Sequence, residues 1–441
     1  MDSDSLLSTT GKGNAKGAGY SRNAGASYAG QGGTQTENIQ QDTYGSFNQI
    51  PVGNSLHISQ MGSGNNQLGD KELRGGGVIV IIADNANLKG KIIANGVPSI
   101  TSEVKEFFHA GSGGYIYIKC KSPSFCNILN EVHANGGYGS DDQESNAGSG
   151  GRIVFTSVKI DSELYDAHGG CSNILTSSNY NGAAGTIYFT DSEKLVIKHT
   201  TKCLASQRTV VDPNKLKEVK IFEVLNQATL AFSNNRIKRN AMNVEIESLS
   251  IINSTLANPI SKDGKDLGEM NIIVRDHLLI QNSTLANIAV SLSIQTKYLN
   301  LSRTSIIKYH NILSLNVTHN FNISGQIIPN LQMTNEATAF PMKEDEPSHI
   351  VYIYAGNATL NEDPTKMIQR DSPEFVFNET SKITGEFIML FSDKNVTIKG
   401  TFENAKESQE GERHIIKLND YYHHTLGSKL LNIIIHWVLS L

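Results

Sequence analysis

The sequence predicts an all-β fold, a parallel β-helix or a related β-solenoid, preceded by a glycine-rich lead-in of low complexity. Two observations predict it. A glycine cluster followed by a short alternating strand occurs four times between residues 75 and 190, and a fixed period of this size indicates stacked structural units. Alternating strands also continue after residue 200, whereas long periodic helices are hard to find.

The four copies share an apolar pattern. Their strands start 37, 37 and 34 residues apart, at Val78, Tyr115, Arg152 and Thr186. Because side chains two apart on a strand share a face, stacked copies would build two apolar ladders that no single copy could bury alone. The predicted ladders are Ile79, Ile116, Ile153 and Ile187, and Ile81, Ile118, Phe155 and Phe189. The side chains between them are mixed, which is typical of a surface or a partly covered face: Val80, Tyr117, Val154 and Tyr188.

Glycines open each strand of the repeat. We expect them to permit positive φ and close backbone approach at tight corners. Three copies also close alike, with Ala94-Asn95-Gly96, Ala134-Asn135-Gly136 and Ala167-His168-Gly169. Asn before Gly tolerates the left-handed region, so this ending predicts a turn. His168 replaces the asparagine of the sister copies, and we expect it to have a role in the turn rather than in catalysis.

Changes in composition divide the chain into four parts. Residues 1–74 contain few apolar runs, so we expect a loosely ordered lead-in; the alternative is one more degenerate coil docked on the solenoid. Residues 75–200 hold the four-fold repeat. Residues 201–402 are predicted to continue the solenoid less regularly, because 31 of the 39 glycines lie at or before Gly185. Residues 403–441 are predicted to be an irregular tail.

Two short sequence motifs indicate that both halves of the chain share one architecture. Residues 253–258 are repeated 29 residues later at 282–287. A glycine flanked two residues away on each side by an apolar residue occurs around Gly90, Gly325, Gly385 and Gly400.

Charge and terminal segments exclude several classes of protein. A formal net charge of −5 gives no electrostatic reason to expect nucleic acid or an anionic membrane as a partner. The N-terminus has no basic region followed by an apolar core, so we expect no signal peptide in this chain. The apolar run at 430–441 is shorter than the roughly 20 residues of a spanning helix, so no transmembrane segment is predicted within the chain.

The sequence has four cysteines and no Cys-x-x-Cys pair, which disfavours zinc and thioredoxin-like sites. Either they form two disulfides in one of three connectivities, in an oxidising compartment, or they are four free thiols. The residues are Cys120, Cys126, Cys171 and Cys203.

Eight Asn-x-Ser/Thr sequons all lie in the second half of the chain. In a secretory protein they would accept N-glycans on exposed turns, whereas a chain rich in Asn, Ser and Thr also produces sequons by chance. The asparagines are Asn253, Asn282, Asn300, Asn316, Asn322, Asn357, Asn378 and Asn395.

Other motifs give no site. The run from Gly136 to Asp141 imitates the start of a calcium-binding nonapeptide, but no tandem copy follows, and such sites need neighbouring repeats. The glycine clusters precede strands rather than helix N-termini, which argues against nucleotide binding. His423 and His424 are adjacent, so on a strand they would face opposite sides. We therefore predict no catalytic residue, metal or cofactor.

The glycine repeat resembles a known family. The segments are Gly111 to Lys119, Ala134 to Gly137, Gly148 to Ile153 and Gly182 to Tyr188. They are similar to large glycine-rich membrane-anchored surface proteins of unknown function in plants and in protists such as ciliates, over about residues 15–190. The resemblance implies an extracellular, non-enzymatic ectodomain and carries over no catalytic residue. Family members typically have a secretory signal and C-terminal membrane segments, which this chain lacks, so we expect a fragment or a short member.

The first hypothesis is therefore a structural or adhesive segment of a cell-surface glycoprotein, with glycans or other surface proteins as candidate partners. The alternative is a carbohydrate-binding or carbohydrate-active β-helix protein, of the lyase or hydrolase kind. An enzyme requires acidic or basic side chains that converge in a cleft, and the sequence shows no such cluster.

Overall fold

The computed structural model shows a chain that is almost entirely β-structure with extensive parallel pairing. It divides into two compact units, one formed by 1–212 with 218–231 and the other by 213–217 with 232–441. The structure describes residues 1–20, 24–34, 43, 46–48, 61–64, 67–68, 71–99, 109–139, 146–161, 163–172, 180–203, 207–234, 241–257, 260–261, 269–286, 291–329, 349–356, 375–385, 387–392, 396–403, 415–416 and 431–435.

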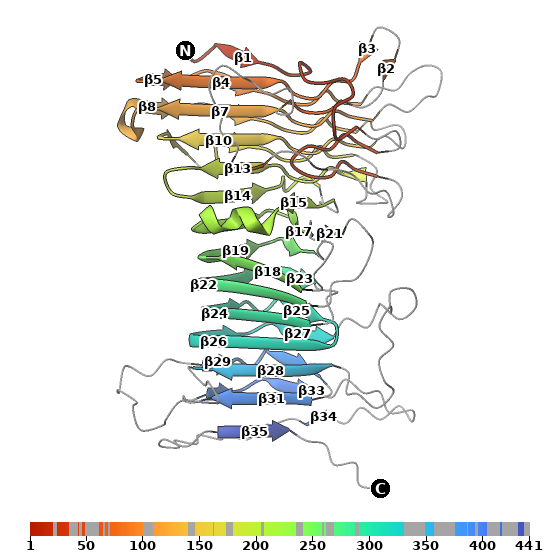
Figure 1. The fold of residues 1–441 in the computed structure, drawn as a ribbon, viewed down its shortest axis with the longest axis vertical. Helices are drawn as coiled ribbons and strands as arrows, with labels where there is room; N and C mark the ends of the chain where they lie inside the picture. The colour runs from red at the N-terminus through yellow and green to blue at the C-terminus, as the bar shows by residue number, and fades with distance from the viewer. Residues whose placement is uncertain are drawn as a thin grey trace. The chain divides into compact units, whose positions relative to one another are not determined.

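The first unit contains three parallel sheets, and each of the first three repeats contributes one strand to every sheet. Figure 1 shows the strands of the first sheet one below another in chain order. The first sheet runs β4 (Val78–Ala83), β7 (Tyr115–Cys120), β10 (Arg152–Thr156) and β13 (Thr186–Phe189), with β14 (Lys194–Lys198) antiparallel to β13 and parallel to β16 (Ile221–Leu225). The second is β5 (Ala86–Leu88), β8 (Cys126–Ile128) and β11 (Lys159–Ile160). The third is β1 (Leu6–Ser8), β6 (Lys91–Ile93), β9 (Val132–His133) and β12 (Tyr165–Asp166).

Smaller elements complete this unit. They are the antiparallel pair β2 (Gln67–Leu68) and β3 (Lys71–Glu72), the strand β15 (Thr209–Val211), and the 3-10 helices η2 (Pro123–Phe125) and η4 (Pro213–Glu218), the last with residues in both units.

The two apolar ladders lie in register across the first sheet. Ile79 is paired with Ile116, Ile116 with Ile153 and Ile153 with Ile187. The second ladder, Ile81, Ile118, Phe155 and Phe189, has the same register. All four members of the first ladder are buried, and Phe189 and Ile81 at the ends of the second are partly buried against the same core. One repeat of the sequence therefore leads the chain from one strand of this sheet to the neighbouring strand.

The glycine-rich connections are not the turns that the sequence suggests. Among the described glycines only Gly11 and Gly356 have positive φ, so left-handed conformations do not explain the clusters. The Ala-Asn-Gly segments are extended instead. The amide of Ala94 donates to the carbonyl of His133 (2.8 Å), and the amide of Gly96 donates to Asn135 (2.9 Å). Backbone hydrogen bonds between neighbouring repeats replace the predicted turns.

Close packing of backbone against backbone is what requires glycine here. A Cβ on Gly150 would overlap the carbonyl oxygen of Ala167 and the amide nitrogen of Gly185. Gly76 and Gly113 have the same relation to the next repeat, and Ala184 occupies the equivalent position in the last copy. These glycines are therefore explained by close approach of the backbone, as expected, and not by positive φ.

The described part of the lead-in differs from the loosely ordered segment that we expected. Ala24, Ala26 and Ala29 are fully buried. The amide of Ala26 donates to the carbonyl of Ala110 (3.0 Å), and the amide of Gly33 donates to Ala147 (2.8 Å). Small residues let this segment insert its backbone between glycine-rich connections, so it needs little apolar side-chain surface.

The lead-in also covers the outer face of the first sheet. Tyr117, Val154 and Tyr188 are at most 5% exposed. The Phe47 ring meets Tyr188 edge-on at 5.3 Å, and the guanidinium of Arg152 lies 5.1 Å from the centre of the Tyr28 ring. Val80 is half-buried, so this is the covered face that was one of the two expectations, buried from Tyr117 to Tyr188 and partly covered at Val80.

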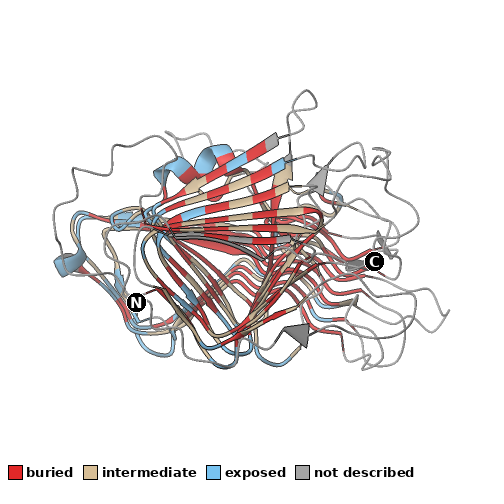
Figure 2. Cartoon of the chain, turned by 90° about the horizontal axis from the view of Figure 1, so that it is seen from below, coloured by how far each residue is buried: buried red, intermediate tan, exposed pale blue. Residues whose placement is uncertain are grey.

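The second unit has two main parallel sheets. The first contains β18 (Ala241–Ile246), β19 (Ser248–Ile252), β22 (Glu269–Gln281), β24 (Ser291–Leu301), β26 (Ile312–Ile323), β28 (Ile350–Ala355), β29 (Phe375–Phe377), β31 (Phe387–Ser392) and β32 (Val396–Ile398). The second contains β20 (Thr255–Leu256), β23 (Thr284–Ala286), β25 (Ile306–Tyr309), β27 (Gln326–Pro329), β30 (Lys382–Thr384) and β33 (Thr401–Glu403). Buried and half-buried residues alternate along these strands (Figure 2). Beside them, β17 (Thr229–Asn234) pairs with β21 (Ile260–Ser261).

The chain passes from one of these sheets to the other at short polar corners. Asn253 and Asn282 have positive φ, and the serine after each is buried. The amide of Ser254 donates to Ser283 Oγ (3.0 Å), whose hydroxyl donates to the carbonyl of Ile251 (3.0 Å). The duplicated motif at 253–258 and 282–287 therefore forms equivalent corners, and Thr255 pairs with Thr284 in register.

Two strands lie in the segment expected to be an irregular tail. They are β34 (Ile415–Ile416), antiparallel to β33, and β35 (Leu431–Ile435), antiparallel to β31. The apolar residues of 430–441 therefore include a strand, which the loss of the glycine pattern concealed.

Candidate functional site

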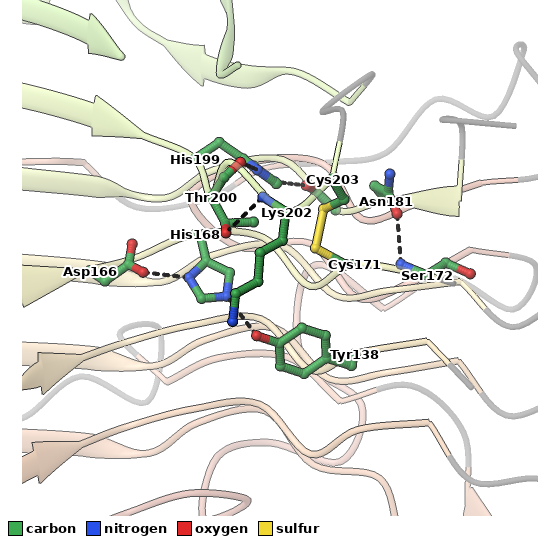
Figure 3. The surroundings of a disulfide bond; sticks show 11 residues. Tyr138, Asp166, His168, Cys171, Ser172, Asn181, His199, Thr200, Lys202 and Cys203 are labelled. Atoms are coloured by element: carbon green, nitrogen blue, oxygen red, sulfur yellow. Dashed lines mark hydrogen bonds and ion pairs between the residues drawn. A yellow bond between two sulfur atoms is a disulfide. The ribbon is translucent and has the colours of Figure 1, made fainter. Parts of the chain in front are cut away.

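All four cysteines form disulfides. Cys120 is bonded to Cys126, which ties the end of β7 to the start of β8, and Cys171 is bonded to Cys203 across 32 residues of sequence. The structure thus selects one of the three connectivities. The second disulfide lies beside a group of histidines and polar side chains (Figure 3).

His168 keeps the backbone position of its sister asparagines. Its amide donates to Asn135 Oδ1 (3.0 Å), as the amide of Asn135 donates to Asn95 Oδ1 (2.8 Å). The side-chain carbonyl oxygen of each asparagine therefore accepts a hydrogen bond from the backbone amide of the equivalent residue in the next repeat. The histidine ends this ladder and brings a titratable ring to a buried position, 7% exposed.

The His168 ring joins a carboxylate to a surface phenol. Its Nδ1 lies 2.6 Å from Asp166 Oδ2, and its Nε2 lies 3.2 Å from the Tyr138 hydroxyl (Figure 3). Since a carboxylate accepts, Nδ1 carries a proton and donates it to Asp166, while Nε2 shares the second hydrogen bond with the tyrosine hydroxyl. Asp166 and His168 share a face because they are two residues apart on an extended segment. Tyr138 is 43% exposed, so the chain of hydrogen bonds reaches the surface.

Burial and charge set the protonation of this chain. Burial alone would raise the pKa of Asp166, but the hydrogen bond and charge of His168, with Lys198 and His133, hold it below its ordinary value. Burial, with the Asp166 charge, raises the pKa of Tyr138. At neutral pH the His168 ring therefore lies between an ionised carboxylate and a protonated phenol.

Two other histidines lie nearby, His199 buried and His133 half-buried. Burial lowers the pKa of His199, whose Nε2 lies 3.0 Å from the Gly182 carbonyl and whose Nδ1 lies 3.2 Å from the Thr200 carbonyl. Burial also lowers the pKa of His133, although Asp166 opposes the shift. Among the described residues, no group of three or more His, Cys, Asp or Glu side chains is placed to hold a metal ion.

Acidification is expected to destabilise the first unit through His109. Burial lowers its pKa from 6.5 to about 4, and its Nδ1 accepts the Asn146 amide (3.1 Å). Between these values the unfolded chain binds a proton that the folded chain does not, so stability falls as pH drops, by up to about 3 kcal/mol. Denaturant unfolding at a series of pH values measures this. His109→Gln keeps an acceptor and should flatten the dependence; an unchanged slope would contradict the assignment.

The predicted glycan acceptors occupy two kinds of position. Asn253, Asn282, Asn300 and Asn322 are exposed. Asn316 is half-buried, and so is Asn378, whose Nδ2 donates to Asn322 Oδ1 (2.5 Å) and Ser324 Oγ (2.6 Å). Asn357 and Asn395 lie outside the described residues, as do Asp141 of the calcium-like motif and His423 and His424.

Sequence reasoning missed the Asp166–His168–Tyr138 chain. The signal was present in the repeat: one copy has a histidine where two others have asparagine, and Asp166 precedes it by two residues. The partner Tyr138 comes from the previous repeat, which only a correct alignment of the extended connections reveals.

No protein-family model, curated protein or solved structure matches the chain. No helix in the described residues has the length and apolar character needed to cross a membrane.

Proposed function

We propose that the chain is a β-solenoid segment of an extracellular or cell-surface protein with a structural or adhesive role. The observation that supports an extracellular location is the pairing of all four cysteines in disulfides, because such bonds persist in oxidising environments and are rare in the cytosol. Exposed sequon asparagines in the second unit support the same location.

The solenoid assignment draws on the way the strands recur. In the first unit each of the first three repeats supplies one strand to each of three parallel sheets, in constant register. In the second unit the chain alternates between two parallel sheets, with buried serines at the corners. Such repetition produces an extended surface with little need for a cleft. The similarity to glycine-rich membrane-anchored surface proteins favours the same role.

The compartment is tested on the protein isolated from its own cells without reductant. Alkylation followed by peptide mass spectrometry should find Cys120 linked to Cys126 and Cys171 linked to Cys203. Enzymatic deglycosylation in water enriched in oxygen-18 should convert one or more of the exposed sequon asparagines to labelled aspartate. Four alkylated thiols and no labelled asparagine would refute the proposal.

A carbohydrate-active enzyme is the second candidate, and the Asp166–His168–Tyr138 chain favours it because a histidine paired with a carboxylate can take the proton of a phenol and let that phenol act as a general base. A cleavage screen over neutral and uronic-acid polysaccharides separates the two. Turnover that His168→Asn and Tyr138→Phe both abolish would replace the first proposal with this one. His168→Asn is the informative variant, since asparagine already occupies the equivalent position in two sister repeats.

A further inference from the structure

The outer side of the main sheet in the second unit carries an open polar surface. The inner side is apolar. Its buried residues pair from strand to strand in the order Ile272, Ile294, Leu315 and Ile353. Side chains alternate along a strand, so the residues between them face outward. We call the outward residues Ser293, Gln295, Ser314, Asn316, Tyr352 and Tyr354 the β24–β28 face.

This face forms two straight rows. Ser293 pairs with Ser314 and Ser314 with Tyr352; Gln295 pairs with Asn316 and Asn316 with Tyr354. Neighbouring strands are about 4.8 Å apart, so equivalent groups recur at that interval. The rows therefore present a regular array of hydroxyl and amide groups.

The serine, glutamine and asparagine side chains of the rows are open. Within the described chain, no side-chain hydrogen bond engages Ser293, Gln295, Ser314 or Asn316. The corner serines of the same unit differ, since Ser283 and Ser305 each donate to a backbone carbonyl. Hydroxyl and amide groups held on a rigid sheet without internal partners are available to a ligand.

Aromatic rings border the rows on two sides. On β28, the rings of Tyr352 and Tyr354 lie 6.5 Å apart and nearly parallel, at 19°. Beyond the shared register shift of β22, β24 and β26, the His277 ring stacks on Tyr298 at 4.4 Å, and His319 lies 5.3 Å from Tyr298. Bulges of this kind redirect side chains, and here they bring three rings into one group.

The two rows themselves carry no charge on β24, β26 and β28, whereas Lys297 is exposed on β24 two residues beyond Gln295. The nearest charged pair toward β18 is neutralised, because Arg275 Nη2 lies 2.5 Å from Glu245 Oε1. An uncharged surface of hydroxyls and amides, flanked by flat rings, complements a chain of uncharged sugars. The hydroxyls of the sugars would bond to the rows, and their C–H faces would pack on the rings.

We propose that the β24–β28 face binds an uncharged polysaccharide chain, which would lie along the rows with its sugars against Tyr352 and Tyr354. The inference rests on the proposed adhesive function and names its ligand class. Asn316 is itself a sequon residue, so an N-glycan attached there is the competing occupant of the same face.

Affinity electrophoresis and calorimetry with the full chain test the proposal. The probes are soluble β-glucan, galactomannan and, as a charged comparison, alginate. We expect retardation by a neutral polymer and weaker or no retardation by alginate. Replacing both rings, Tyr352→Ala with Tyr354→Ala, should weaken binding by about tenfold or more. The matched control, Tyr352→Phe with Tyr354→Phe, keeps the rings and should stay within about threefold of the wild type.

Three results would overturn the proposal. They are no binding to any neutral polymer, equal binding by the alanine and wild-type chains, and binding that appears only after N-glycans are removed or in Asn316→Gln. The last would assign the face to the chain's own glycan. Circular dichroism of each variant checks the fold. The disulfide and sequon measurements are independent of these results, so failure of the ligand assignment and failure of the proposed compartment can be told apart.

Discussion

Gly150→Ala is expected to destabilise the first unit by at least about 3 kcal/mol, or to prevent it from folding. The new methyl group would overlap the carbonyl of Ala167 and the amide of Gly185, both of them backbone atoms. Flexible side chains can move aside, whereas these atoms are fixed by hydrogen bonds: the Gly185 amide donates to that same Ala167 carbonyl (2.6 Å). Relief therefore requires two repeats to separate.

Hydrogen exchange measured by mass spectrometry suits this test, because it assigns a change to peptides of the first unit. Ala184→Gly is the matched control. It alters the equivalent position of the last copy, and we expect about 1 kcal/mol or less, from backbone entropy. Equal protection in Gly150→Ala and the wild type would show that the connections do not pack as described.

Loss of the Cys171–Cys203 disulfide is expected to cost about 4 kcal/mol, twice the cost of losing Cys120–Cys126. The first closes 32 residues and the second closes 6, and the entropy that a cross-link removes from the unfolded chain grows with the size of the loop, which gives about 4 and about 2 kcal/mol.

The variants are the paired serine substitutions, Cys171→Ser with Cys203→Ser and Cys120→Ser with Cys126→Ser. Each is unfolded in denaturant with hydrogen exchange as the probe, and the wild type is the reference in both cases. A larger loss from the short loop than from the long one would contradict the prediction and would indicate that packing of the buried Cys120 and Cys126 outweighs chain entropy.

The sequence was informative where side chains repeat and uninformative where backbone packs on backbone. Ile116 and Ile153 could be aligned because apolar residues recur at a constant period. The role of Gly150 could be named only in part, since a glycine cluster suggests unusual φ as readily as close approach, and only the structure separates the two.

The lead-in was misjudged for a related reason. Ala24 and Ala26 are too small to form an apolar signal, yet both are fully buried. The Asp166–His168–Tyr138 chain was missed because its members come from different repeats. A pairing of residues 30 apart, such as Tyr138 with His168, follows from three-dimensional register and from no local motif.

The position of the lead-in has a consequence for biosynthesis. The Ala26 amide reaches Ala110, Gly33 reaches Ala147, and the Gln31 amide donates to the carbonyl of Arg208. This segment leaves the ribosome before partners that are made up to about 180 residues later, and at roughly 5–20 residues per second the delay is on the order of ten seconds or more. Contacts so distant in sequence form slowly. During that interval the outer face of the first sheet lacks this cover, so residues 26–33 dock late in the assembly of this unit.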